Sequence, residues 1–143
     1  MFSHFLDAQD PIYPTVLAEL RAGRKRTHWM WFVFPQVAGL GFSEMSRRFA
    51  LAGIEEARAY LEHKVLGARL VECTQAVLAY APGVDGRGKS VHEIFGSPDD
   101  RKFFSSMTLF AHATETLPSV WPFRAALDAF FEGKEDEETL RRI

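Results

Sequence analysis

An apolar stripe at helical spacing is the feature that most constrains the fold of this chain. Leu66, Leu70, Cys73 and Val77 stand at positions i, i+4, i+7 and i+11, which places them on one face of an α-helix. No segment sustains the alternation of apolar and polar residues that a half-buried strand requires. The 9 valines and 4 isoleucines are also outnumbered by 17 alanines and 13 leucines. The sequence therefore predicts an all-α fold, a compact multihelical bundle of about six to eight helices with no significant sheet.

Start and stop signals place the individual helices. Ser43, Ser97 and Asp136 are the expected N-caps, and Pro98 follows Ser97 at the first helical position that proline favours. The expected segments are one that begins near Pro11 and Pro14 and ends at Gly23, His28–Phe34 (stopped by Pro35), Ser43 to about Ala52, Glu55–Leu61, Leu66–Val77, Ser97 to about Thr114, Ser119–Phe131 (ended by Gly133), and Asp136–Leu140.

Length and composition indicate one globular domain over residues 1–143, since 47% of the residues are hydrophobic. A net charge of −2 gives no general attraction to nucleic acid or to acidic membranes, so neither is an expected partner. Cys73 is the only cysteine and is expected to be an inert core thiol. The start of the chain lacks the pattern of a signal peptide, and no apolar run is long enough to span a bilayer, so a cytoplasmic location is expected.

Residues 83–90, GVDGRGKS, match the phosphate-loop pattern G-x-x-x-x-G-K-[ST]. That pattern binds phosphate where it joins a buried parallel strand to a long helix. Here it follows a stripe of helical period, and no hydrophobic strand ending in aspartate supplies the magnesium partner. We therefore expect a solvated loop with Lys89 in water, and no P-loop ATPase.

The aromatic segment HWMWFVFPQ, residues 28–36, has two interpretations. It is a buried core helix, or it is the wall of a pocket in which aromatic faces contact a ligand and His28 and Gln36 orient it. On a helix the side chains of Trp29 and Trp31 diverge by about 200°. We expect Trp29 to anchor the core, and Trp31 to border the pocket together with His28.

A second group of candidate ligand-binding residues lies on the predicted helix after residue 97. Lys102, Ser105 and Ser106 share one side of that helix, where an ammonium and two hydroxyls are suited to a phosphate or a carboxylate. The alternative is an ordinary solvated face. The basic clusters 24–26 and 47–48 are read as solvated surface. The five histidines show no metal-ligand spacing, so no metal site is expected, and nothing indicates a cofactor.

Several long runs of the sequence resemble one bacterial family, domain of unknown function 1810, whose members are often labelled calpastatin-like. The runs are GRKRTHWMWFVFPQVAGLG, EARAYLEHKVLGARLVEC, HEIFGSPDDRKFFSSMTLF and DAFFEG. The resemblance covers nearly the whole chain and implies a compact, single-domain, mainly helical fold, but no activity. The calpastatin label is misleading, because a calpain-inhibitor segment is disordered and this composition is globular.

The sequence supports three functional hypotheses. The leading one is a small anionic or nucleotide-like ligand bound in a pocket bordered by residues 28–36, with His28, Trp31, Gln36, Lys102, Ser105 and Ser106 as the candidate contacts. The main alternative is a non-enzymatic module that binds an unidentified protein partner through its helical surface. A glycohydrolase acting on ADP-ribose-type substrates ranks third. Whether the chain is an enzyme is left open, and no catalytic residue is assigned.

Overall fold

The computed structural model describes residues 1–83, 86–117 and 120–143, and these residues form an all-α fold without a sheet. The helices are α1 (Ser3–Gln9), α2 (Tyr13–Arg21), α3 (Met30–Val33), α4 (Glu44–Arg48), α5 (Ile54–Glu62), α6 (Lys64–Leu78), α7 (Val91–Phe95), α8 (Asp99–Ala113), α9 (Phe123–Phe131) and α10 (Glu137–Leu140). The prediction of an all-α fold is confirmed. The predicted count of six to eight helices is wrong, because the described residues contain ten, four of which have only four or five residues.

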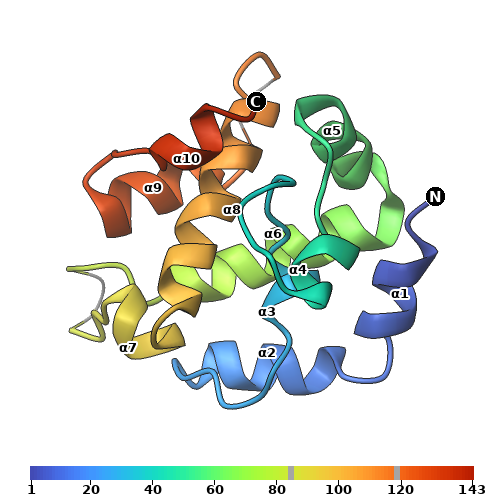
Figure 1. The fold of residues 1–143 in the computed structure, drawn as a ribbon. Helices are drawn as coiled ribbons and strands as arrows, with labels where there is room; N and C mark the ends of the chain where they lie inside the picture. Colours follow the sequence, from blue (N-terminus) through green and yellow to red (C-terminus); the bar gives the residue numbers. More distant parts are fainter. Residues whose placement is uncertain (84–85, 118–119) are drawn as a thin grey trace.

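The two longest helices, α6 and α8, form the centre of the molecule, and the other helices pack around them (Figure 1). Helix α6 packs against α2, α5 and α9, while α8 packs against α5, α7, α9 and α10. The predicted apolar stripe of α6 is confirmed, since Leu66, Leu70, Cys73 and Val77 are all buried. Burial of such side chains is the main favourable contribution to a fold of this kind.

The aromatic residues form much of the core between these helices. Phe34 meets Phe95 and Phe103 edge-on, with ring centroids 5.8 Å and 5.1 Å away, and Phe95 stacks on Phe103 at 4.9 Å. Edge-to-face and offset arrangements at these separations suit the ring quadrupoles. They tie the residue after α3 to α7 and α8.

Two of the three predicted N-caps are confirmed. The Ser43 hydroxyl accepts a hydrogen bond from Ser46 N at the start of α4, and the Asp136 carboxylate accepts one from Thr139 N at the start of α10. The predicted end of the Ser43 helix near Ala52 is wrong. The helix stops at Arg48, because the chain then turns into an extended stretch in which Leu51 pairs with residues 36–38.

The prediction that Ser97 caps α8 is wrong. The N-cap of α8 is Pro98, no side chain caps this helix, and the Ser97–Pro98 peptide bond is cis. Backbone carbonyls take the place of a capping side chain, because Asp100 N donates to Gly96 O at 2.9 Å and Arg101 N donates to Pro98 O at 3.1 Å.

Two other expected helices are shorter than predicted. The run His28–Phe34 forms only the single turn of α3, Met30–Val33, although it does end before Pro35. The helix expected from Ser119 begins at Phe123, and Ser119 itself lies outside the described residues.

Candidate functional site

The two tryptophans around α3 have different surroundings, as their spacing predicts. Trp29 is fully buried, and its indole Nε1–H donates to Glu19 Oε1 at 2.9 Å. Trp31 is half-buried, and the Lys102 ammonium lies 4.8 Å from the centre of its ring. The prediction that Trp29 anchors the core is confirmed. Lys102 on α8 places its ammonium against the face of the Trp31 ring, and this cation–π contact favours a fixed position for the ammonium.

Glu19 on α2 holds the segment that leads into α3. Its carboxylate accepts hydrogen bonds from Arg26 N (2.8 Å), Thr27 N (3.1 Å), Thr27 Oγ1 (2.7 Å) and Trp29 Nε1 (2.9 Å). Burial opposes ionisation of Glu19, but these four donors outweigh it, and the pKa of the carboxyl lies below its usual 4.5. Glu19 thus fixes Trp29, and through it the turn of α3 that carries Trp31.

We expect Glu19 to make folding stability depend on pH in the acid range. Because its pKa is lower in the folded state, its stabilising contribution is complete above about pH 4.5, the value of the unfolded chain, and is lost as the pH falls through the lower folded value. Urea unfolding followed by circular dichroism from pH 7 to pH 3 measures this loss. Glu19→Gln is the control, because it keeps the shape and removes the titration. That variant should be less stable at pH 7 and should lose less stability on acidification; equal slopes for the two proteins would contradict the assignment.

A cavity of about 250 Å³ is lined by the loop after α3, helix α4, the start of α8 and the start of α10. We call it the α8–α10 cavity. Its lining consists of Gln36, Leu40, Gly41 and Ser46 from the loop and α4, Pro98, Arg101, Lys102 and Ser105 from the start of α8, and Asp136 and Glu138 from the start of α10.

The loop that lines the cavity is held at both ends. Leu51 N donates to Gln36 O at 2.9 Å, which closes the base of the loop, and an Arg142 guanidinium N–H donates to Gly39 O at 3.2 Å. At Gly41 a β-carbon would lie 2.6 Å from Ser46 Cβ, so only glycine allows this approach of the loop to α4.

The cavity brings together three of the six candidate residues, Gln36, Lys102 and Ser105. Trp31 is not part of the lining, but its ring contacts Lys102, which does line the cavity. His28 is exposed and, like Trp31, lies outside the lining. Ser106 is fully buried in α8, and its hydroxyl has no partner among the described residues. The alternative of a solvated α8 face does not hold for Ser105 and Ser106, since both are buried.

Two lysines near the cavity share the carboxylate of Asp99. Asp99 forms a 2.8 Å ion pair with Lys25 and a looser one, at 3.7 Å, with Lys102. Arg101 is exposed and forms no ion pair with any described residue. The Lys102 ammonium, on a residue that lines the cavity, is therefore only partly neutralised by Asp99.

The sequence did not identify Asp136 and Arg101 as residues that line the cavity. Asp136 was expected only as a helix cap, but it is also buried, lines the cavity and accepts a 2.8 Å hydrogen bond from the Ser105 hydroxyl. Nothing in the sequence indicates that a residue 31 positions after Ser105 returns to it. Arg101 directly precedes the candidate Lys102, and its positive charge could have identified it as a further ligand-binding candidate.

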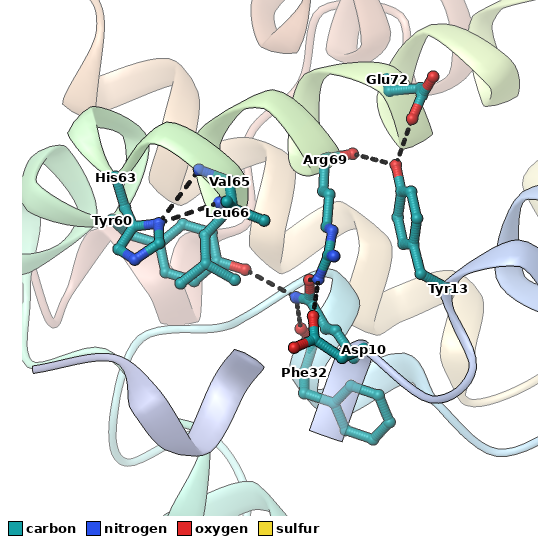
Figure 2. A network of polar contacts seen from close by, with 10 residues as sticks. Asp10, Tyr13, Phe32, Tyr60, His63, Val65, Leu66, Arg69 and Glu72 are labelled. Carbon is teal, nitrogen blue, oxygen red and sulfur yellow. Dashed lines mark hydrogen bonds and ion pairs between the residues drawn. The ribbon is translucent and has the colours of Figure 1, made fainter. Parts of the chain in front are cut away.

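A second polar network lies at the junction of α1, α2, α3, α5 and α6 (Figure 2). Gln9 Nε2 donates to Phe32 O at 2.6 Å and to the Tyr60 hydroxyl at 3.2 Å, while Arg69 donates to Gln9 Oε1 and Asp10 Oδ1 at 3.3 Å and 2.8 Å. Both polar atoms of the Gln9 amide are used within the protein. The network therefore joins helices, and its central Gln9 amide has no polar atom left for a ligand.

The cysteine on α6 adjoins this network and is unreactive. Cys73 is fully buried, and burial raises the pKa of its thiol to about 12. The predicted core position of Cys73 is confirmed, and the raised pKa opposes formation of the reactive thiolate.

The phosphate-loop match has a structural setting unlike that of a nucleotide-binding loop. It follows α6 rather than a strand, and its residues 84–85 lie outside the described part of the chain. The Ser90 hydroxyl accepts from Glu93 N and caps the short helix α7. The prediction that Lys89 lies in water is wrong: its ammonium is half-buried, donates to Gly23 O at 3.1 Å and lies 5.5 Å from the Tyr80 ring centre.

Two further features bear on the expected classes of function. Among residues 1–83, 86–117 and 120–143, no three His, Cys, Asp or Glu side chains are grouped so that they could hold a metal ion. None of the helices found there is long and apolar enough to cross a membrane.

Comparison with known proteins gives one family and one similar solved structure. Residues 1–143 match the family described as "Protein of unknown function (DUF1810)". The crystal structure of the conserved hypothetical protein Rv1873 from Mycobacterium tuberculosis is 50% identical in sequence, with a TM-score of 0.87 over 97% of this chain and 93% of that one. No curated protein matches the chain. The family match extends over the whole sequence, which confirms the resemblance of the aromatic and α8 runs, and the chain therefore belongs to the DUF1810 family.

Proposed function

We propose that this protein binds a small anionic ligand in the α8–α10 cavity. The observation that carries the proposal is the position of Lys102. Lys102 lines the cavity, and its ammonium lies 4.8 Å from the centre of the Trp31 ring and shares Asp99 with the closer Lys25. A cation that is fixed and incompletely neutralised at a cavity wall is suited to a carboxylate or a phosphate.

Neighbouring groups supply further donors. The Arg101 guanidinium lines the same cavity, and a guanidinium presents a planar set of N–H donors that matches carboxylate and phosphate oxygens. The Gln36 side-chain amide also lines it and makes no hydrogen bond within the described residues. Together these three side chains offer the anion an ammonium and a guanidinium from α8 and an amide from the loop after α3.

The size of the cavity limits the ligand. A volume of about 250 Å³ lies below the range of about 300–1,000 Å³ that is usual for pockets binding drug-sized molecules. We therefore favour the small acid of the sequence-based hypothesis over a whole nucleotide.

The surface supports a ligand site better than a docking face. The large exposed apolar residues come from the two ends of the chain, the loop before α4, the start of α6 and the α8–α9 connection: Met1, Phe42, Val65, Leu117, Val120 and Ile143. Met1 and Ile143 line one hollow beside α5, and the other four are spread over three segments. Scattered exposed apolar residues are normal on globular domains.

We expect Lys102→Met to weaken anion binding by about tenfold or more, because it removes a charge-assisted hydrogen bond and keeps the length of the side chain. The probes are glutarate and inorganic phosphate, titrated at low ionic strength and followed by tryptophan emission. Trp31 should report the titration, because an anion that draws the ammonium away changes the environment of its ring.

Two variants control this experiment. Lys64→Met removes an exposed lysine outside the cavity and should bind as the wild type does. Trp31→Phe should retain binding in calorimetry and lose most of the emission change. Wild-type protein that binds neither probe, or equal affinity in Lys102→Met, would overturn the proposed function.

A further inference from the structure

We propose that the ligand of the α8–α10 cavity is a small zwitterion, whose ammonium group binds Asp136 while its anionic group binds Lys102 and Arg101. This inference rests on the proposed function and adds a cationic group to the ligand. Its basis is the unequal use of the two carboxylate oxygens of Asp136, a residue that is only 7% exposed and lines the cavity.

Every hydrogen bond that the described residues donate to the Asp136 carboxylate goes to one oxygen. Oδ2 accepts from Ser105 Oγ at 2.8 Å, from Thr139 Oγ1 at 2.6 Å and from Thr139 N at 3.3 Å. Oδ1 accepts no hydrogen bond from any described residue. These contacts fix the carboxylate as the cap of α10 and leave its second oxygen without a donor.

The second oxygen is open to the cavity rather than sealed in the core. Among the described residues the Ser106 hydroxyl is the only fully sealed side-chain polar atom without a partner, so Asp136 Oδ1 is not sealed. Because Asp136 lines the α8–α10 cavity, that oxygen gains its access there. A nearly buried carboxylate oxygen thus faces the space in which the anion is proposed to bind.

The chemistry of this oxygen selects a cationic donor. An ionised carboxylate that has lost water on one side is stabilised most by a donor that carries positive charge. Glu138 adds a second carboxylate to the same wall, although its Oε1 pairs with Arg141 at 2.6 Å and its Oε2 with Arg142 at 3.6 Å, so Asp136 carries the argument. An ammonium satisfies this wall better than a hydroxyl does, and a simple anion leaves it unsatisfied.

The spacing of the two walls sets the length of the ligand. Lys102 and Ser105 are three positions apart on α8, which separates their β-carbons by about 5–6 Å. Ser105 in turn holds Asp136 through a 2.8 Å hydrogen bond. The cationic and anionic walls therefore lie about one helical turn apart, which suits a carboxylate or phosphate joined to an ammonium through a short carbon chain. Amino acids and aminoalkyl phosphates share this chemistry.

Calorimetric titration with two matched pairs tests the inference. L-Glutamate is compared with glutarate, and phosphoethanolamine with ethyl phosphate, so that each pair differs in the ammonium group. We expect the ammonium-bearing member of at least one pair to bind wild-type protein about tenfold tighter or more. The pair with the larger difference identifies the anion as carboxylate or phosphate. This comparison uses the wild-type protein alone and does not depend on the folding of a variant.

Asp136→Asn gives the second test. An asparagine carbonyl still accepts from Ser105 and Thr139 and is as good a helix cap as aspartate, so the fold should be retained. We expect the preference for the ammonium-bearing members to fall to about one, with the affinity for glutarate and ethyl phosphate unchanged or higher. Asp128→Asn, at an exposed carboxylate outside the cavity, should keep the preference.

The outcomes separate this inference from the proposed function. If glutarate or ethyl phosphate binds in a Lys102-dependent way and the ammonium adds nothing, the anion site stands and the zwitterion is wrong. A preference for the ammonium that survives in Asp136→Asn also overturns the inference. If none of the four compounds binds the wild type, both proposals fail.

Discussion

Replacing Trp29 with alanine is expected to lower the free energy of unfolding by about 3–5 kcal/mol, the usual cost of removing a large buried aromatic side chain. Trp29 is the largest fully buried side chain among the described residues, and its ring centroid lies 6.3 Å from that of Phe34. The Lys25 ammonium lies 5.0 Å from the ring centre. The truncation leaves a cavity and also removes the indole donor of the Glu19 carboxylate.

Urea unfolding followed by far-ultraviolet circular dichroism measures this effect without relying on tryptophan emission. Trp31→Ala is the matched control. Its ring is half-buried, so the same truncation should cost clearly less. Trp29→Phe should fall between the wild type and Trp29→Ala, because it refills most of the space but leaves Glu19 with one donor fewer. A Trp29→Ala protein as stable as Trp31→Ala would contradict the assignment of Trp29 as the core anchor.

The position of Trp29 shows what the sequence can predict about this fold. Its burial followed from its spacing relative to Trp31, although the segment forms a single helical turn instead of the longer helix assumed. The stripe on α6 was predicted for the same reason, since a helical period over several turns has few alternative explanations. The burial of a long helix follows the regular spacing of its apolar residues, and that spacing is visible in the sequence.

The short helices were harder to predict because one turn has no period to detect. Helix α7 did carry a local signal: Ser90 and Glu93 form a reciprocal capping box, an S-x-x-E pattern that was present in the sequence and was not used. The start of α8 gave a misleading signal. Serine, proline and two acids in succession resemble a capped helix, but backbone carbonyls of Gly96 and Pro98 satisfy the first amides instead.

The candidate site depends on contacts between segments far apart in the chain, which explains the partial success there. Lys102 and Ser105 were expected on one face of α8, and both line the cavity. Ser106 was grouped with them, but α8 is buried around most of its circumference, so adjacency on the helix did not determine which hydroxyl faces the cavity. The approach of Asp136 to Ser105 is set by the packing of α10 against α8, for which no local pattern exists.

The corner between α5 and α6 gives the second large effect on stability. Replacing Gly67 with alanine is expected to destabilise the protein by about 3 kcal/mol or more, at or beyond the upper end of typical overpacking costs. A β-carbon at this position would lie 2.9 Å from the carbonyl carbon of Leu61 and still closer to its oxygen. These are backbone atoms at the end of α5, so no side-chain rotation relieves the clash.

The corner has little freedom to open. Only His63 separates α5 from α6, and its Nδ1 accepts hydrogen bonds from Val65 N and Leu66 N, each at 3.2 Å (Figure 2). Leu61 and Leu66 are both buried on either side of it. Moving α6 away from Leu61 would break the cap and lift Leu66 from the core.

The sign of the Gly67→Ala effect makes the test decisive. In an unconstrained helix interior, alanine is more stable than glycine by about 0.5–1 kcal/mol, so propensity alone predicts a gain. The neighbouring exposed position supplies the control: Ala68→Gly should cost only about 1 kcal/mol, because nothing but propensity changes there. Thermal and urea unfolding of the two variants should therefore rank Gly67→Ala well below Ala68→Gly. If alanine at position 67 is neutral or stabilising, the backbone of α5 does not approach α6 this closely, and the corner is held by His63 and side-chain packing alone.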